Sequence, residues 1–152
     1  QSVSQVFFKE GSKAKSNNRF VLLFDKAFLQ LMVVSIILVT VIYFLAPPII
    51  KLLFDERWIN SVPVIKYLVL MMIFQIPSTA LGTTFIILDR IGVKLIWDVI
   101  INGLRLISIL IFHDSLMEFV ISMVVFVSIG HLGNILYMRH MIKQLCRSEI
   151  ST

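Results

Sequence analysis

Residues 93–112 read VKLIWDVIINGLRLISILIF, a stretch that is apolar enough to cross a bilayer apart from a few polar positions. These polar positions recur at helical spacing: Lys94, Asp98, Asn102 and Arg105. At 100° per residue they fall within about 80° of one another, so they share one face of a helix. A charge at this depth costs roughly 2.5–3.5 kcal/mol, and it therefore faces a bundle interior or an aqueous cavity. The pattern predicts a membrane helix whose polar face lines a transport pathway.

The composition places the whole chain in the same class. Of its 152 residues, 58% are hydrophobic and only 15% are charged, well outside the range of soluble domains. We therefore expect an all-α membrane protein. The chain opens on Gln1, and residues 3–8 resemble the end of an earlier apolar helix, so we expect it to be part of a longer protein.

Four transmembrane helices are predicted, because each crossing needs about 20 predominantly apolar residues. Their expected ranges are 27–46, 62–88, 93–112 and 116–138. The first should end before Pro47-Pro48, because proline cannot donate a backbone hydrogen bond and restricts the residue before it. The second should kink at Pro77. Between and beyond these helices we expect a linker (1–26), an outer loop with a short interfacial helix (47–61) and a tail (139–152).

The distribution of basic residues predicts the orientation. Most Lys and Arg residues fall in 1–26, at Arg90 and Lys94, or in 139–152, whereas the opposite side holds Lys51, Arg57 and Lys66. Because basic loops stay cytoplasmic, both ends of the chain should be cytoplasmic. The net charge of +5 is thus explained by topology and anionic lipid. Dispersed basic residues without a stacking platform argue against nucleic acid as a partner.

Arg105 needs a partner that the predicted helix does not supply. It lies about 18 Å into a core of roughly 30 Å. Lys94 and Asp98 are four residues apart and can pair, but Asp98 and Arg105 are separated by roughly 10.5 Å of helical rise. A guanidinium matches phosphate and carboxylate, so an anionic headgroup is the natural candidate. The alternatives are a buried Asp–Arg network that only holds helices together, and a Lys94 side chain that snorkels to the interface.

Two other segments carry polar residues. His131 could titrate near neutral pH and couple transport to protons, or it could be a hydrogen-bonded packing residue beside the small residues Gly130 and Gly133. Gln75 and Pro77 belong to a locally polar stretch of helix 62–88. Transporters use such broken helices around substrate, but the stretch could equally be a simple kink.

Catalytic signatures are missing from the sequence. His113-Asp114 has no second His or Cys at ligand spacing, and no phosphate loop or nucleophile elbow is present. Cys146 is a single thiol, which is interpreted as an ordinary reduced cysteine. We expect a transporter without a metal or cofactor, rather than an enzyme.

The order of several short motifs resembles a known family. The motifs are Gln5-Val6-Phe7-Phe8, LAPPIIKLLF (45–54), ERW (56–58), PVI (63–65) with Leu68, and LDR (88–90). Together they are similar to the polysaccharide (O-antigen, Wzx-type) flippases of the MOP exporter superfamily, over almost the whole chain. In that family a glycine commonly occupies the places of Asp55 and Asp89, so these two turns depart from the pattern.

The resemblance implies that the chain is the last four of about twelve helices, which form two bundles that rock around a central cavity. Such flippases move a polyprenyl-diphosphate-linked oligosaccharide, an O-antigen or exopolysaccharide repeat unit, across the bacterial inner membrane and supply the polysaccharide polymerase machinery. They present cationic side chains to the cavity, and Arg105 is the residue that matches this role. The alternatives are a lipid II flippase, a multidrug exporter, which would favour acidic cavity residues, and a non-transport anchor or interaction segment.

Overall fold

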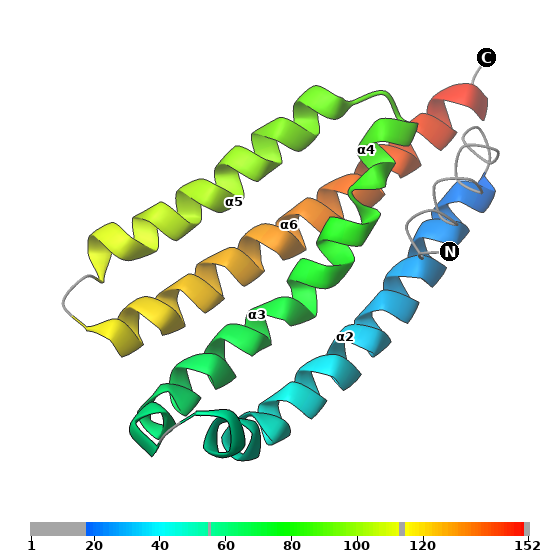
Figure 1. Cartoon of the computed structure of the whole chain (residues 1–152). Coiled ribbons are helices and arrows are strands. Elements are labelled where there is room, and N and C mark those ends of the chain that lie inside the picture. The colour runs from blue at the N-terminus through cyan, green and yellow to red at the C-terminus, as the bar shows by residue number, and fades with distance from the viewer. Residues whose placement is uncertain (1–17, 55, 113–114, 151–152) are drawn as a thin grey trace.

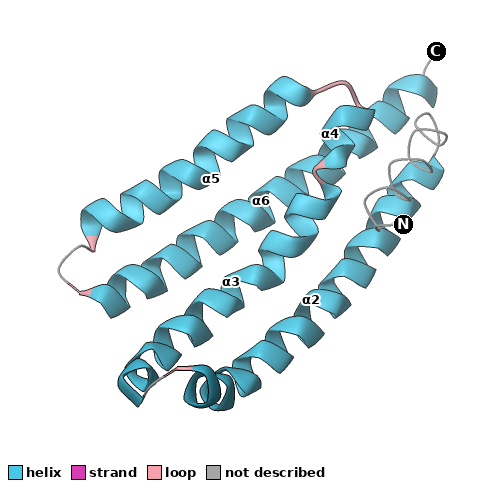
Figure 2. Cartoon of the chain, viewed as in Figure 1, coloured by secondary structure: helices cyan, strands magenta, loops and turns pink. Residues whose placement is uncertain are grey.

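The computed structural model describes residues 18–54, 56–112 and 115–150. Four long helices lie roughly antiparallel (Figure 1): α2 (Asn18–Leu53), α3 (Val62–Leu81), α5 (Ile91–Ile111) and α6 (Leu116–Ile150). Two short elements join them, the 3-10 helix η1 (Glu56–Ser61) and α4 (Thr83–Ile87). The described residues contain no strand (Figure 2). The all-α prediction is therefore confirmed for this part of the chain.

The long helices lie side by side in the order α2, α3, α6 and α5. α3 packs against both α2 and α6, and α5 packs against α6 on its other side (Figure 1). In the described ranges, three helical segments are long and apolar enough to cross a membrane: Arg19–Leu53, Arg57–Ile87 and Leu116–Leu145. α5 has 21 residues, and a helix of that length spans about 31 Å. However, it carries Lys94, Asp98 and Arg105, so the four-span count stays a prediction.

The first helix does not end before Pro47-Pro48 as expected. α2 continues through both prolines to Leu53, and it already begins at Asn18, inside the stretch 1–26 expected to be a linker. The prolines remove the hydrogen bonds to two carbonyls of the preceding turn, but the following turn is held in place. Ile50 is buried there, and its carbonyl accepts a 2.9 Å hydrogen bond from the Phe54 N–H. Packing beyond the prolines thus outweighs their local cost.

The second predicted helix, 62–88, is interrupted at Gly82. α3 runs through Pro77, and the Gly82 N–H donates to the Thr79 carbonyl at 3.2 Å before α4 begins. A Cβ atom at Gly82 would lie 3.1 Å from that carbonyl oxygen and 3.7 Å from Cε of Lys94. The break therefore falls at a residue whose missing side chain avoids a tight contact with the Thr79 carbonyl, and Lys94 of α5 lies beside it. A kink at Pro77 itself stays a prediction.

The turn after α4 is a Schellman motif. The Asp89 N–H donates to the Ile86 carbonyl at 3.1 Å, and the Arg90 N–H donates to the Phe85 carbonyl at 2.7 Å. Asp89 has a φ of 57°, the left-handed conformation that glycine usually adopts in this motif. Asp is one of the few other residues that tolerates it. Asp89 therefore occupies the position of this turn at which glycine is usually found.

One end of the bundle is held by a buried cluster shared by α2, α3, α4 and α6. Phe20 and Phe24 from the first turns of α2 are fully buried there, together with Met138 and Ile142 of α6. The Arg139 guanidinium and the Asp25 carboxylate bridge the same two helices through two hydrogen bonds of 2.8 Å. Because this contact continues past residue 138, the described part of the expected tail (139–152) is helical. It does not separate from the bundle.

Several predictions fall outside the described residues. They concern the apolar residues 3–8, the Asp55 turn and the His113-Asp114 connection. The side chain of Cys146 also lies outside the described part.

Candidate functional site

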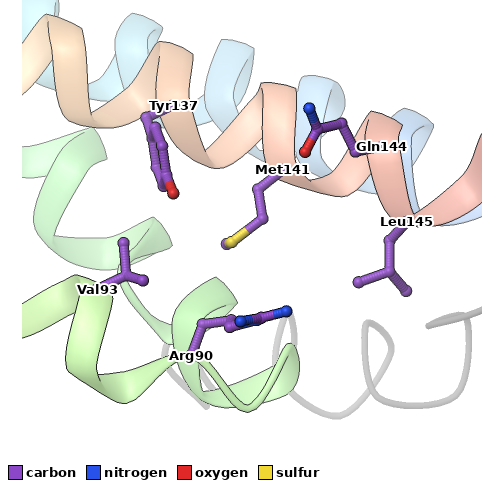
Figure 3. A pocket seen from close by; sticks show the side chains of 6 residues that line it. All are labelled: Arg90, Val93, Tyr137, Met141, Gln144 and Leu145. Atoms are coloured by element: carbon purple, nitrogen blue, oxygen red, sulfur yellow. The ribbon is translucent and has the colours of Figure 1, made fainter.

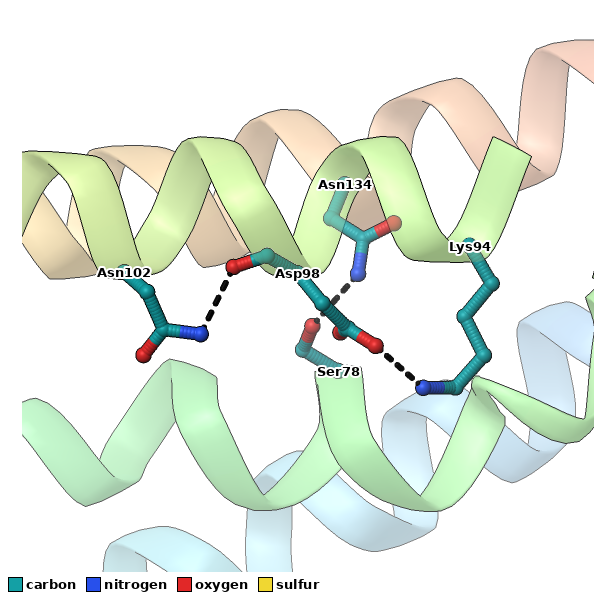
Figure 4. Close-up of polar contacts among 5 residues, drawn as sticks. All are labelled: Ser78, Lys94, Asp98, Asn102 and Asn134. Carbon is teal, nitrogen blue, oxygen red and sulfur yellow. Dashed lines mark hydrogen bonds and ion pairs between the residues drawn. The ribbon is translucent and has the colours of Figure 1, made fainter. Parts of the chain in front are cut away.

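The polar residues predicted to share one face of α5 do share it. In Figure 4 the side chains of Lys94, Asp98 and Asn102 extend from α5 on the side on which α3 lies. α5 itself packs on α6 rather than along α3. We call the set Lys94, Asp98, Asn102 and Arg105 the α5 polar face.

A relay of contacts runs along this face. Lys94 Nζ lies 2.6 Å from Asp98 Oδ2, which confirms the predicted pair. Asn102 Nδ2 donates to the backbone carbonyl of Asp98 at 2.8 Å, and its side-chain oxygen accepts from Arg105 Nη1 at 3.2 Å. Asn102 is therefore the link between the ion pair and the guanidinium. As the helical rise predicted, Asp98 and Arg105 make no direct ion pair.

Most of the α5 polar face is open rather than covered by the neighbouring helices. The side chains of Lys94 and Asp98 are 40% and 47% exposed. Asn102 is exposed and Arg105 is half-exposed. A charge costs several kcal/mol in hydrocarbon. If α5 forms the predicted third crossing, this face therefore requires water, another polypeptide or a polar ligand against it.

Arg105 carries the unbalanced charge of this face. Among the residues that the structure describes, Arg105 pairs with no carboxylate, and its only hydrogen-bond partner is the neutral Asn102. The Lys94 and Asp98 charges offset each other at 2.6 Å. The net charge of the face is therefore positive and lies at the guanidinium.

The contact between α5 and α6 fixes the direction of the polar face. A Cβ atom at Gly133 would lie 3.2 Å from Cη2 of Trp97, and one at Gly130 would lie 3.0 Å from Cδ1 of Leu104. Small residues allow such close helix packing, and these two glycines let α5 approach α6. With its Trp97 and Leu104 side against α6, α5 leaves its charged side partly exposed.

His131 of α6 is buried. It is 6% exposed, and neither ring nitrogen has a hydrogen-bond partner among the described residues. Arg105 and Asp98 of α5 are the charges that act on its ring. A buried polar group without a partner is uncommon, so His131 is set apart from an ordinary packing residue by its unused nitrogens and its charged neighbours.

The sequence did not predict the polar contact between α3 and α6. Asn134 Nδ2 donates to Ser78 Oγ at 3.1 Å, and both residues are buried (Figure 4). Asn134 Oδ1 has no partner in the described part. The sequence shows only that α3 and α6 each carry small polar residues. It does not indicate that Ser78 and Asn134 are the two that form a hydrogen bond.

The other residues singled out on α3 take no part in this network. Pro77 is buried, and Gln75 is half-buried without a side-chain hydrogen bond to any described residue. The structure therefore joins the four residues of the α5 polar face through side-chain contacts, buries His131 on α6, and leaves Gln75 outside both. The described residues also hold no group of three or more His, Cys, Asp or Glu side chains suited to a metal ion.

No protein-family model, curated protein or solved structure matches this chain.

Proposed function

We propose that this chain is the C-terminal part of a flippase that translocates polyprenyl-diphosphate-linked oligosaccharide across the bacterial cytoplasmic membrane. The observation that carries the proposal is the half-exposed Arg105, whose only partner in the described part of the chain is a neutral amide. An uncompensated guanidinium with several donors suits a diphosphate better than any uncharged cargo. The motif order that resembles O-antigen flippases points to the same cargo.

The relay gives each member of the α5 polar face a role in this proposal. Arg105 contacts the diphosphate, and Asn102 holds the guanidinium through its 3.2 Å contact. Asp98 neutralises Lys94 at 2.6 Å rather than Arg105, so the cation nearest the membrane centre stays available. The α5 polar face therefore has one net positive charge, at Arg105, which attracts an anion.

The proposed topology has four crossings, with α5 as the third and both ends of the chain in the cytoplasm. The basic residues near both ends support this orientation. The Asp25–Arg139 contact joins the start of α2 to the last part of α6, which supports placing both ends on the same side of the membrane. Partners in this scheme are the lipid-linked oligosaccharide, membrane lipids and the polysaccharide polymerase.

The alternatives make different demands on α5. A multidrug exporter that handles cations should present acidic residues, which disfavours it here. A lipid II flippase also carries a diphosphate, so Arg105 fits that cargo equally well. A non-transport anchor would need Arg105 to pair with a helix of a partner protein.

Thiol labelling tests whether the face lines an aqueous pathway. In a Cys146→Ser background, Arg105→Cys should react in membranes with a charged, membrane-impermeant thiol reagent. Two control positions on the same helix are Leu110→Cys, which is 75% exposed on the apolar side, and Ile101→Cys, which is 5% exposed against α6. Reaction of the Arg105→Cys variant but of neither control supports the proposal. An Arg105→Cys variant as inert as Ile101→Cys would favour the anchor.

A further inference from the structure

A second polar site lies at the end of the bundle where α4 turns into α5. It is a pocket of about 390 Å³, and the described residues that line it are Arg90, Val93, Tyr137, Met141, Gln144 and Leu145. Figure 3 shows Arg90 and Val93 on one side and the α6 residues on the other. The pocket therefore lies between the start of α5 and the last part of α6, away from Arg105 and Asn102.

Two hydrogen-bond donors in this pocket are unused. Neither the Arg90 guanidinium nor the Tyr137 hydroxyl has a hydrogen-bond or ion-pair partner among the described residues. Figure 3 shows the hydroxyl pointing toward the side on which Arg90 lies. Gln144 differs, because its Nε2 is already 2.8 Å from Nε2 of His140. Among the described residues, the pocket therefore offers a cation and a hydroxyl that donate to no other group.

The backbone of Arg90 is held by hydrogen bonds on both sides. Its N–H donates to the Phe85 carbonyl at 2.7 Å, and its carbonyl accepts from the Val93 N–H at 3.1 Å. With both backbone groups engaged, the start of the side chain is fixed by the turn. A fixed cation loses less freedom on binding than one on a loose loop.

The depth of the pocket relative to the bilayer follows from the helices around it. The apolar segment Arg57–Ile87 ends just before Arg90, and the rings of Tyr137 and Trp97 contact each other 5.8 Å apart. Aromatic residues of this kind mark the membrane–water interface. Val93, Met141 and Leu145 add an apolar wall beside the two donors. The pocket thus offers an anion site at headgroup depth, with apolar surface next to it.

We propose that this pocket binds the phosphate of an anionic phospholipid, with Arg90 and Tyr137 on the phosphate oxygens and the apolar wall along the start of an acyl chain. Basic pockets between membrane helices hold lipid headgroups in this way. Free inorganic phosphate shares the anionic chemistry, but it would leave the apolar wall unused. This site is separate from the flippase pathway and does not depend on it.

Tryptophan quenching tests the proposal without an activity assay. The chain has two tryptophans, so Trp58→Phe, in a protein whose tryptophans outside this chain are also replaced by Phe, leaves Trp97 as the only tryptophan fluorophore. The ring of Trp97 lies 5.8 Å from that of Tyr137, centroid to centroid. The protein is reconstituted in phosphatidylcholine vesicles containing a small fraction of bromine-labelled phosphatidylglycerol or bromine-labelled phosphatidylcholine. We expect phosphatidylglycerol to be favoured near Trp97 by about fivefold, the effect of one cation at the membrane surface. Arg90→Gln should remove the preference.

Lys143→Gln is the matched control, because it removes an exposed cation of α6 that does not line the pocket. It should keep the preference. Equal quenching by both lipids in the parent protein would overturn the proposal, as would an equal loss in the Lys143→Gln and Arg90→Gln variants. Displacement of the labelled lipid by millimolar inorganic phosphate would also overturn it, because the site would then recognise the anion alone.

Discussion

Trp97 of α5 packs directly over Gly133 of α6: its Cη2 atom lies 3.2 Å from where a Cβ at position 133 would be. This contact determines which side of α5 faces the bundle. Because Trp97 and Asp98 are adjacent in sequence, fixing the ring against α6 turns the carboxylate toward the open side. The direction of the α5 polar face therefore depends on the close approach of α5 at Gly133, together with that at Gly130.

The first prediction concerns this close approach. Gly133→Val should destabilise the protein by about 1–3 kcal/mol, because the new methyl groups overlap the indole and a packed interface does not absorb them. Unfolding in detergent with increasing denaturant measures the change. Gly103→Val is the control, because nothing lies within 4 Å of a Cβ at that glycine. If both variants lose the same stability, the effect reflects helix propensity rather than the contact with Trp97.

The second prediction concerns the turn between α4 and α5. Asp89 holds a φ of 57°, so Asp89→Gly should stabilise the protein by about 0.5–1 kcal/mol by relieving the left-handed strain. Asp89→Ala should destabilise it, because alanine lacks the short polar side chain that eases this conformation. The midpoint of thermal unfolding in one detergent compares the variants. Equal midpoints for glycine and alanine would mean that the backbone conformation at residue 89 is not as described.

The third prediction concerns the polar contact between α3 and α6. Ser78→Ala should cost about 1–3 kcal/mol, because it leaves the Asn134 amide buried without its acceptor. The double change Ser78→Ala with Asn134→Leu should cost less than the sum of the two single changes, since it removes both polar groups. Unfolding free energies of the four proteins form the cycle. Strict additivity would show that the 3.1 Å bond contributes no coupling.

The sequence predicted α5 best because its pattern is local. Polar residues at i, i+4 spacing can be placed on one face without knowing what lies opposite, and the Lys94–Asp98 pair follows from the same spacing. The failure at Pro47-Pro48 has the opposite cause. Local rules disfavour a helix there, but buried Ile50 and the hydrogen bond from Phe54 hold the next turn in place.

The end of α6 and the contact between Ser78 and Asn134 could not be read from the sequence for a related reason. The basic residues after position 138 suggest an aqueous tail, whereas buried Ile142 continues the helix against α2. Ser78 and Asn134 are 56 residues apart, and only the packing of α3 on α6 brings them together. Local periodicity describes each helix, but it does not say which helices pair.

The central claim is that Arg105 contacts an anionic lipid-linked cargo, and surface glycan display tests it most directly. A flippase-null bacterium would carry the protein to which this chain belongs, with Arg105→Ala, Arg105→Lys and the control Leu106→Ala, at matched levels in the membrane. Leu106 is the adjacent residue and is 61% exposed on the apolar side of α5. Losing a charge-assisted contact costs about 1.5–3 kcal/mol, so display should fall by about tenfold or more in Arg105→Ala. It should recover in part in Arg105→Lys and stay near the parent level in Leu106→Ala. Full display from Arg105→Ala would contradict the account.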